Sequence, residues 1–210
     1  MTGKPSRAAI PTIVTVPTKQ DRRRELRARR RTIAASRDLP ADGRRIADHA
    51  LALIRSVTPG EADEPMGYAS RTSPPTITLY EPLPVEPDVS ALLHEAYALG
   101  IRVIVPITLP DLDLDWARWS PDGLGEPLGK DAVADVTVAF IPGLSVDDSG
   151  TRMGQGGGCY DRTLPRIDSG APVVCVLHPG EDHTVPALPR EAHDVPVDGV
   201  LTADGLRWVG

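Results

Sequence analysis

The feature that most constrains the fold is an alternation of strand-like and helix-like segments in the middle of the chain. Residues 76–80 and 101–105 are short apolar segments typical of buried strands, and residues 88–99 between them have a helical pattern that ends before Gly100. This order is that of a strand–helix–strand unit with parallel strands. Further strands are expected at residues 136–141, 173–177 and 200–202. The pattern therefore predicts an α/β fold, with a mainly parallel sheet covered by helices on both faces.

Two helices are expected ahead of this unit. Thr18 and Asp21 have the spacing of a capping box, and a strongly charged helix is predicted from Thr18 to about Ser36. A second helix is predicted over residues 42–55, where apolar side chains recur at the spacing of one helical face. Residues 57–75 are rich in Pro, Gly, Ser and acidic side chains, which is typical of a long surface loop.

Length and composition favour one soluble domain. A chain of 210 residues can bury roughly 70% of the surface that it exposes when unfolded, so we expect residues 18–210 to form a single domain behind a mobile extension, residues 1–17. The two cysteines form neither a CxxC pair nor a zinc-binding cluster, which argues against a disulfide scaffold and a structural zinc site. No apolar stretch reaches the roughly 18 residues of a membrane span. We therefore expect a cytoplasmic monomer that does not bind membranes.

Charge is unevenly distributed along the chain. The net charge of −6 argues against a nucleic-acid partner, whose phosphates require a basic surface. Near the N-terminus, however, arginines gather at positions 22–24, 27 and 29–31. Such a run is either a solvated helix face or an anion-binding surface, and the sequence leaves both interpretations open.

The segment Phe140–Leu164 carries the most chemical information. A buried strand is predicted to end at Pro142, and four glycines then crowd into the five positions 154–158. Glycine lets a backbone approach a ligand closely, and successive N–H groups in such a loop can hold phosphate oxygens. Arg152 before the glycines suits phosphate, and Asp161 after them suits magnesium. The spacing matches neither common nucleotide-binding glycine motif, so a plain surface loop is the alternative.

A longer pattern runs through this segment. It comprises Pro142, Gly143, Leu144, Asp147, Gly150, Arg152, Gly154, Gly156, Gly157, Gly158, Tyr160, Asp161, Arg162 and Leu164. The pattern resembles the signature of the 5-formyltetrahydrofolate cyclo-ligase family, and the similarity extends from Lys19 to Thr202. Outside the segment it is carried by Lys19, Arg23, Tyr80, Glu86, Asp88, Trp119, residues 125–127 and residues 188–198. The resemblance implies an α/β three-layer sandwich similar to that of the sugar-phosphate isomerases and coenzyme A transferases.

The resemblance also implies a site for ATP and magnesium. The residues implied for ATP are Lys19, Arg23, Arg152, Met153, Gly154, Gln155, Gly156, Gly157, Gly158, Cys159 and Tyr160, with Lys19 and Arg152 in the catalytic role. Lys19 and Arg23 are four residues apart, hence on one face of a helix, from which they could converge on phosphates. Asp161 and Asp194 would hold Mg²⁺. Taken alone, Asp194 is also compatible with a turn or cap.

For the folate substrate, the resemblance implies Tyr80, Glu86, Trp119, Gln155, Gly156, Gly157, Gly158 and Cys159. Glu86 would accept hydrogen bonds from pterin nitrogens, and Trp119 would cover the ligand. Taken alone, Glu86 could be an exposed side chain and Trp119 a core residue. The family often has an aromatic or long basic residue where this chain has Gln155, and a tyrosine where it has Cys159. These changes touch the folate side of the loop more than the phosphate side.

The implied reaction is the ATP-dependent cyclisation of 5-formyltetrahydrofolate to 5,10-methenyltetrahydrofolate, with release of ADP and phosphate. ATP would phosphorylate the formyl oxygen, and N10 of the same folate would displace the phosphate. The partners are then small molecules, and no protein nucleophile is needed, in keeping with the lack of a convincing Ser/His/Asp or Cys/His arrangement. Two alternatives remain: a catalytically silent nucleotide-binding relative with a regulatory role, and an RNA-associated module that uses the arginine-rich helix.

Overall fold

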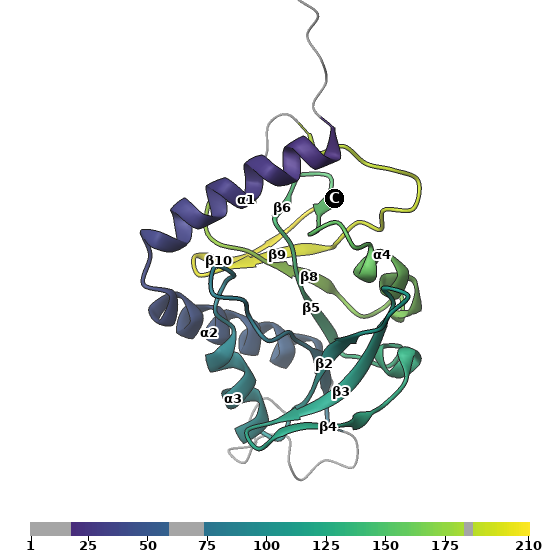
Figure 1. Cartoon of the computed structure of the whole chain (residues 1–210). Coiled ribbons are helices and arrows are strands. Elements are labelled where there is room, and N and C mark those ends of the chain that lie inside the picture. The colour runs from purple at the N-terminus through teal and green to yellow at the C-terminus, as the bar shows by residue number, and fades with distance from the viewer. Residues whose placement is uncertain (1–17, 59–73, 183–186) are drawn as a thin grey trace, which may run out of the picture.

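The computed structural model describes residues 18–58, 74–182 and 187–210 (Figure 1). Its elements, in chain order, are α1 (Lys19–Ala35), α2 (Leu39–Val57), β1 (Thr76–Thr78), α3 (Ser90–Ala98), β2 (Arg102–Thr108), β3 (Leu114–Ser120), β4 (Gly123–Pro127), the 3-10 turn η1 (Lys130–Val133), β5 (Val138–Pro142), β6 (Ser145–Val146), β7 (Arg152–Met153), α4 (Cys159–Thr163), the 3-10 turn η2 (Leu164–Arg166), β8 (Val173–Val176), β9 (Gly199–Thr202) and β10 (Gly205–Trp208). The predicted extension, residues 1–17, and most of the predicted loop at 57–75 lie outside the described residues.

The main sheet has a parallel centre and antiparallel edges. Its strand order is β10-β9-β8-β5-β1-β2-β3-β4. The four pairings from β9 through β8, β5 and β1 to β2 are parallel, which confirms the predicted mainly parallel sheet. The β2–β3, β3–β4 and β9–β10 pairings are antiparallel, and the strands β3, β4 and β10 were not predicted. The carboxyl ends of β1, β5 and β8 therefore meet at one edge of the sheet, where α/β proteins place their ligand sites.

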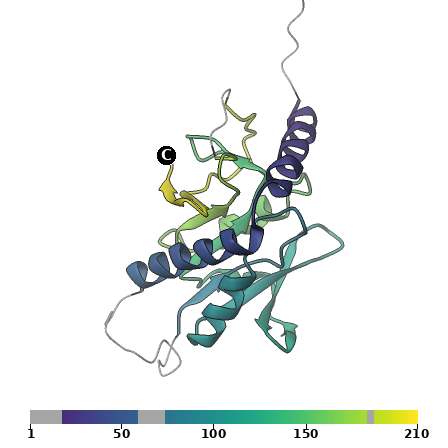
Figure 2. The same ribbon diagram turned by 90° about the vertical axis from the view of Figure 1, so that its left-hand side faces the viewer.

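Helical segments cover both faces of the sheet, as predicted. On one face lie α2 and α3 (Figure 2). They bury Ile46, Ile54 and Leu92 against the sheet residues Val103 and Phe140. On the other face the short η1, α4 and η2 pack over a second core that contains Trp116, Val133, Ile141, Leu164 and Cys175. Because both faces of β5 are covered, its first four residues are all buried, which explains their continuous apolar sequence. Among the described helices, none is long and apolar enough to cross a membrane.

The two N-terminal helices begin at side-chain caps. The Thr18 hydroxyl accepts a hydrogen bond from the Asp21 N–H at 3.2 Å, and the Asp21 carboxylate accepts one from the Thr18 N–H at 3.3 Å, so the predicted capping box is confirmed. The second helix begins at Leu39, three residues before its predicted start. Its cap is Asp38, whose carboxylate accepts from the Ala41 N–H at 3.0 Å, with a proline in the first turn.

Helix α1 does not lie against either core. It crosses the carboxyl edge of the parallel strands, at the top of Figure 1, apart from α2 and α3. There Leu26 packs in a small cluster with Leu144, Met153 and Leu188, all of which are buried. This position brings a helix from the start of the chain next to the loops that follow β5 and β7.

Gly143, directly after β5, allows close packing beneath this edge. A Cβ atom at position 143 would lie 2.5 Å from the Cys175 sulfur and 3.2 Å from Cγ of Arg152. Real Cβ atoms do not approach sulfur so closely, so any side chain here must displace buried neighbours. The absence of a side chain at Gly143 therefore lets Arg152 pass over the end of β5.

Asp147 anchors the loop between β6 and β7. One of its carboxylate oxygens accepts hydrogen bonds from the N–H groups of Ser149 and Thr151, both at 3.0 Å, and the other accepts from the Leu188 N–H at 2.9 Å. Burial alone would raise the pKa of this carboxyl, but the hydrogen bonds outweigh burial and lower it. Asp147 therefore fixes the position of β7, which carries Arg152, relative to the C-terminal segment at Leu188.

We expect Gly143→Ala to lower the free energy of unfolding by about 1 to 3 kcal/mol, because the added methyl group collides with the Cys175 sulfur and the Arg152 side chain. The matched control is Gly125→Ala on the exposed strand β4, where a Cβ atom would meet its nearest neighbour at an ordinary 3.6 Å. Urea denaturation of both variants measures the difference. Equal stability of the two variants would contradict the packing described for Gly143.

We expect Asp147→Asn to lower the free energy of unfolding at pH 7 by about 1 to 3 kcal/mol, because an amide cannot accept from all of these N–H groups. The pKa of Asp147 is lowered from 3.8 on folding, so its contribution is present above that value and is lost as the pH falls through the folded-state pKa. Stability of the variant should therefore decline less steeply below about pH 4 than that of the wild type. The control is Asp122→Asn, at an exposed turn, and an unchanged acid profile in Asp147→Asn would contradict the anchoring role.

Candidate active site

The glycine loop joins β7 to α4 and depends on left-handed backbone angles. Gly156 has φ 112° and Gly158 has φ 68°, values that favour glycine strongly over other residues. Gly158 is the residue that caps α4, and no side chain contributes to that cap. Residues 155–157 are exposed, so the predicted loop is present with its backbone open to a ligand.

Arginines of α1 hold the glycine loop from above. Nε of Arg23 donates to the Gly154 carbonyl at 3.2 Å, and the Arg23 side chain runs past Gly156. One turn later Arg27 donates to the Gln155 side-chain oxygen at 2.9 Å and to the Gln155 carbonyl at 2.5 Å. Contacts with the glycine loop therefore account for two arginines of the basic run, Arg23 and Arg27. Of these, Arg27 was missing from the predicted site. The outward face of α1 carries a surface depression lined by Gln20, Arg24, Arg27 and Arg31.

Lys19, at the start of α1, lies next to the C-terminal segment. Its Nζ atom is 2.6 Å from Oδ2 of Asp194 and 3.4 Å from Oε1 of Glu191. Burial alone would raise the pKa of Asp194, but hydrogen bonds from Lys19 and from the Glu191 N–H lower it. The predicted residues Lys19 and Asp194 are thus neighbours, although 175 positions separate them.

Arg152 is buried beneath the glycine loop. Its guanidinium donates to the Pro142 carbonyl at 3.1 Å and to Oδ1 of Asp161 at 3.3 Å, and it lies over the Tyr160 ring, 5.4 Å from the ring centre. Nε of Arg152 is buried and has no partner within the part of the chain that the structure describes. A buried guanidinium with an unused donor, beside an open glycine loop, is suited to binding an anion.

The carboxylates in this region suit magnesium only in part. Each of the two predicted ligands is already paired with a cation, Asp161 with Arg152 and Asp194 with Lys19. The ligand atoms of Glu191, His193 and Asp194 lie within 4.8 Å of one another, and Asp161 is not in that group. Carboxylate oxygens fit Mg²⁺, which usually binds through one or two carboxylates together with substrate phosphates rather than in an all-protein cage. The donor set is therefore compatible with Mg²⁺ that arrives bound to a nucleotide.

The predicted folate residues Tyr80 and Glu86 are both buried. The hydroxyl groups of Tyr80 and Tyr160 are buried without a partner among the described residues, and burial raises the pKa of both. Glu86 is 7% exposed, and its carboxylate accepts from the Leu83 N–H at 3.2 Å. The charge of Glu86 also helps to raise the pKa values of Tyr80 and Tyr160.

A buried ion pair between Arg30 and Glu181 was not predicted. Nε and Nη2 of Arg30 donate to the two Glu181 oxygens at 2.8 and 2.6 Å, and Nη2 also donates to the Gly143 carbonyl at 2.5 Å. The His178 N–H donates to Glu181 at 3.0 Å. The available sequence signal was the spacing of Arg30, four residues after the buried Leu26 and seven after Arg23, on the inner face of α1.

The structure places Trp119 beneath α3, in the core cluster that also contains Tyr80. Trp119 packs edge to face against His94 and Tyr97, and it follows Arg118, which pairs with Ile104 in the amino-terminal half of β2. Trp116 lies closer to the carboxyl edge, because it pairs with Pro106. Trp116 is fully buried, and its indole N–H has no partner among the described residues.

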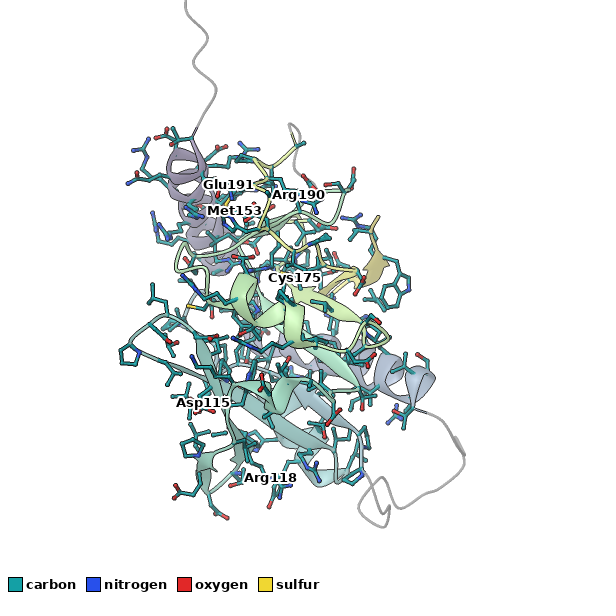
Figure 3. The ribbon with its side chains drawn as sticks, turned by 90° about the vertical axis from the view of Figure 1, so that its right-hand side faces the viewer. Asp115, Arg118, Met153, Cys175, Arg190 and Glu191 are labelled. Atoms are coloured by element: carbon teal, nitrogen blue, oxygen red, sulfur yellow. The ribbon has the colours of Figure 1, made fainter. Side chains whose placement is uncertain are left out.

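Cys175 lies in the centre of the molecule, below the loop segments that carry Met153 and Glu191 (Figure 3). Burial raises the pKa of its thiol to about 12, so the thiol is neutral at physiological pH. A neutral, buried thiol has a structural role rather than a reactive one.

Comparisons with known proteins point to one family. Residues 68–203 match the model of the 5-formyltetrahydrofolate cyclo-ligase family. A 5-formyltetrahydrofolate cyclo-ligase of Mycolicibacterium smegmatis is 35% identical over 165 residues, which cover 70% of this chain and 84% of the relative. The enzyme of the same name from Escherichia coli K12 is 28% identical over 173 residues, covering 70% of this chain and 93% of the relative.

Solved structures give the same answer for the fold. A 5,10-methenyltetrahydrofolate synthetase of Mycoplasma pneumoniae superposes with a TM-score of 0.62 at 18% identity, over 88% of this chain and 98% of its own. The synthetase of Aquifex aeolicus also gives 0.62, at 24% identity, over 91% of this chain and 92% of its own. From the sequence match and the shared fold together, the chain belongs to the 5-formyltetrahydrofolate cyclo-ligase family.

Proposed function

We propose that this protein converts 5-formyltetrahydrofolate to 5,10-methenyltetrahydrofolate at the expense of ATP, releasing ADP and phosphate. The observation that carries the proposal is the position of Arg152. Its guanidinium lies beside Gly154 of the glycine loop, donates to Asp161 and lies over the ring of Tyr160, whose hydroxyl is buried. One buried cation thus borders both a phosphate-binding region and a region suited to a heterocycle.

The phosphate side of the proposed site combines fixed charges with backbone donors. Lys19 and Arg23 approach it from α1, and Arg152 approaches it from below the glycine loop. Positioned cations and N–H groups are the main requirement for phosphoryl transfer, because charge builds up on the transferred oxygens. Asp161 and Asp194 would hold Mg²⁺ directly or through water, and the ion would neutralise charge on the nucleotide phosphates.

On the folate side, Glu86 and Tyr80 are proposed to bind the pterin, with residues 155–159 covering the reacting end. Glu86 has the acceptor oxygens that pterin N–H groups require. Trp119 is left out of this proposed set, because it packs against α3 residues instead.

The reaction needs positioning rather than a protein nucleophile. The formyl oxygen attacks the γ-phosphorus of ATP, so that an O–P bond forms and ADP departs. N10 then attacks the formyl carbon, the C–O bond breaks, and phosphate leaves while N10 gives up its proton. The neutral, buried thiol of Cys175 is unsuited to nucleophilic attack. Holding the formyl oxygen in line with the γ-phosphorus, and N10 within reach of the formyl carbon, therefore supplies much of the catalysis.

The test follows formation of the methenyl product by its near-ultraviolet absorbance, with 5-formyltetrahydrofolate, Mg²⁺, and ATP present or omitted. We expect ATP-dependent product, and a fall in kcat/KM of about 100-fold to 1,000-fold in Arg152→Met, because a donor to the developing charge is lost. The matched control is Arg118→Met, at an exposed position on β3 far from the glycine loop (Figure 3).

Two results would contradict the proposal. Absence of product at any enzyme concentration, with ATP binding intact, would favour the catalytically silent relative. An equal loss of activity in both arginine variants would remove Arg152 from the reaction.

A further inference from the structure

Arg30 has an unused pair of donors in the interior of the protein. The residue is 1% exposed, and Nε and Nη2 make three hydrogen bonds, two to Glu181 and one to the Gly143 carbonyl. Nη1 is also buried, but it has no partner among the described residues. Leaving a buried charged donor unpaired is costly, so such a group calls for a bound ligand or an ordered water molecule.

The guanidinium is held in one orientation. Glu181 binds it through both carboxylate oxygens, and Glu181 itself accepts from the His178 N–H and, at its carbonyl, from the Ser145 hydroxyl. The same network reaches the segment that carries Glu86, because Nε2 of His178 is 3.1 Å from the Val85 carbonyl. Nη1 is therefore a fixed donor rather than the mobile end of a long side chain.

Glu86 directly follows Val85, so its backbone adjoins the hydrogen-bonded network of Arg30, Glu181 and His178. The charge of Glu86 affects the pKa of Arg30, and the charge of Arg30 affects the pKa of Tyr80, whose hydroxyl is buried without a partner. Burial alone would lower the pKa of Arg30, but Glu181 raises it overall, so the guanidinium stays protonated. An arginine that can only donate thus stands near a carboxylate that, when ionised, can only accept.

We propose that Arg30 is a further substrate-binding residue, whose Nη1 donates a hydrogen bond to the 4-oxo group of the folate pteridine while Glu86 accepts from the neighbouring ring N–H and amino groups. A 2-amino-4-oxopyrimidine edge presents an acceptor beside donors, which complements Arg30 and Glu86. The inference rests on the proposed function, since it assumes that a reduced folate occupies this site. It assigns to Arg30 the selection of oxo-pteridines over amino-pteridines.

The first test compares two ligands on the wild-type protein by calorimetry without ATP. They are 5-formyltetrahydrofolate and its 2,4-diamino counterpart, in which an amino group replaces the 4-oxo group. We expect the diamino compound to bind about 10-fold to 100-fold more weakly, because its amino group cannot accept from Nη1 and its ring lacks the N–H that Glu86 accepts; the Arg30 variant below separates the two effects. Equal affinity for the two ligands would overturn the inference, and this comparison needs no variant to fold.

The second test uses Arg30→Lys, which keeps the positive charge for Glu181 but has no second nitrogen for the ligand. We expect it to bind 5-formyltetrahydrofolate about 10-fold or more weakly, with the affinity for the diamino compound unchanged. The matched control is Arg29→Lys, which loses only the hydrogen bond from an exposed side chain to the Gly180 carbonyl. Thermal unfolding of both variants monitors the fold.

The outcomes separate this inference from the proposed function. If Arg30→Lys binds both pteridines more weakly by the same factor, Arg30 has only a structural role. If the wild type forms the methenyl product but does not distinguish the pteridines, only the assignment of Arg30 fails. If the wild type binds neither pteridine, the proposed function fails together with it.

Discussion

The ion pair between Arg30 and Glu181 determines where α1 lies, and the rest of the site depends on it. A buried ion pair contributes little net stability, because desolvation offsets most of the attraction, but removing one partner costs about 3 to 5 kcal/mol. Its main effect is therefore specificity: it allows α1 one position over the carboxyl edge of the sheet. Lys19 and Arg23 reach the C-terminal segment and the glycine loop because they lie on the same helix.

A second constraint is the close packing at the end of β5. Without a side chain at Gly143, the Cys175 sulfur and the Arg152 side chain share the space beneath the loop. The carbonyls of Pro142 and Gly143 then accept from Arg152 and Arg30, so both arginines are held against the same strand end. The phosphate and folate sides of the proposed site are thus built on one short turn of backbone.

Much of this could be predicted from local sequence. The alternating segments gave the parallel strands, and the glycine loop with Arg152 and Asp161 forms a nearly continuous motif. Strand β4 was not predicted, because all five of its residues are exposed and the sequence there has no apolar pattern. The partnership of Arg30 with Glu181 spans 151 positions, and nothing in the spacing of either residue identifies the other. The position of Trp119 depends on the register of β3 against β2, which the sequence alone does not determine.

The most direct test of the proposed site is a crystal structure with a non-hydrolysable ATP analogue, Mg²⁺ and 5-formyltetrahydrofolate bound. We expect the phosphates between Lys19, Arg23 and the glycine loop, with the pteridine beyond Arg152, next to Glu86. Phosphates bound on the outward arginine face of α1, or a pteridine stacked on Trp119, would contradict it.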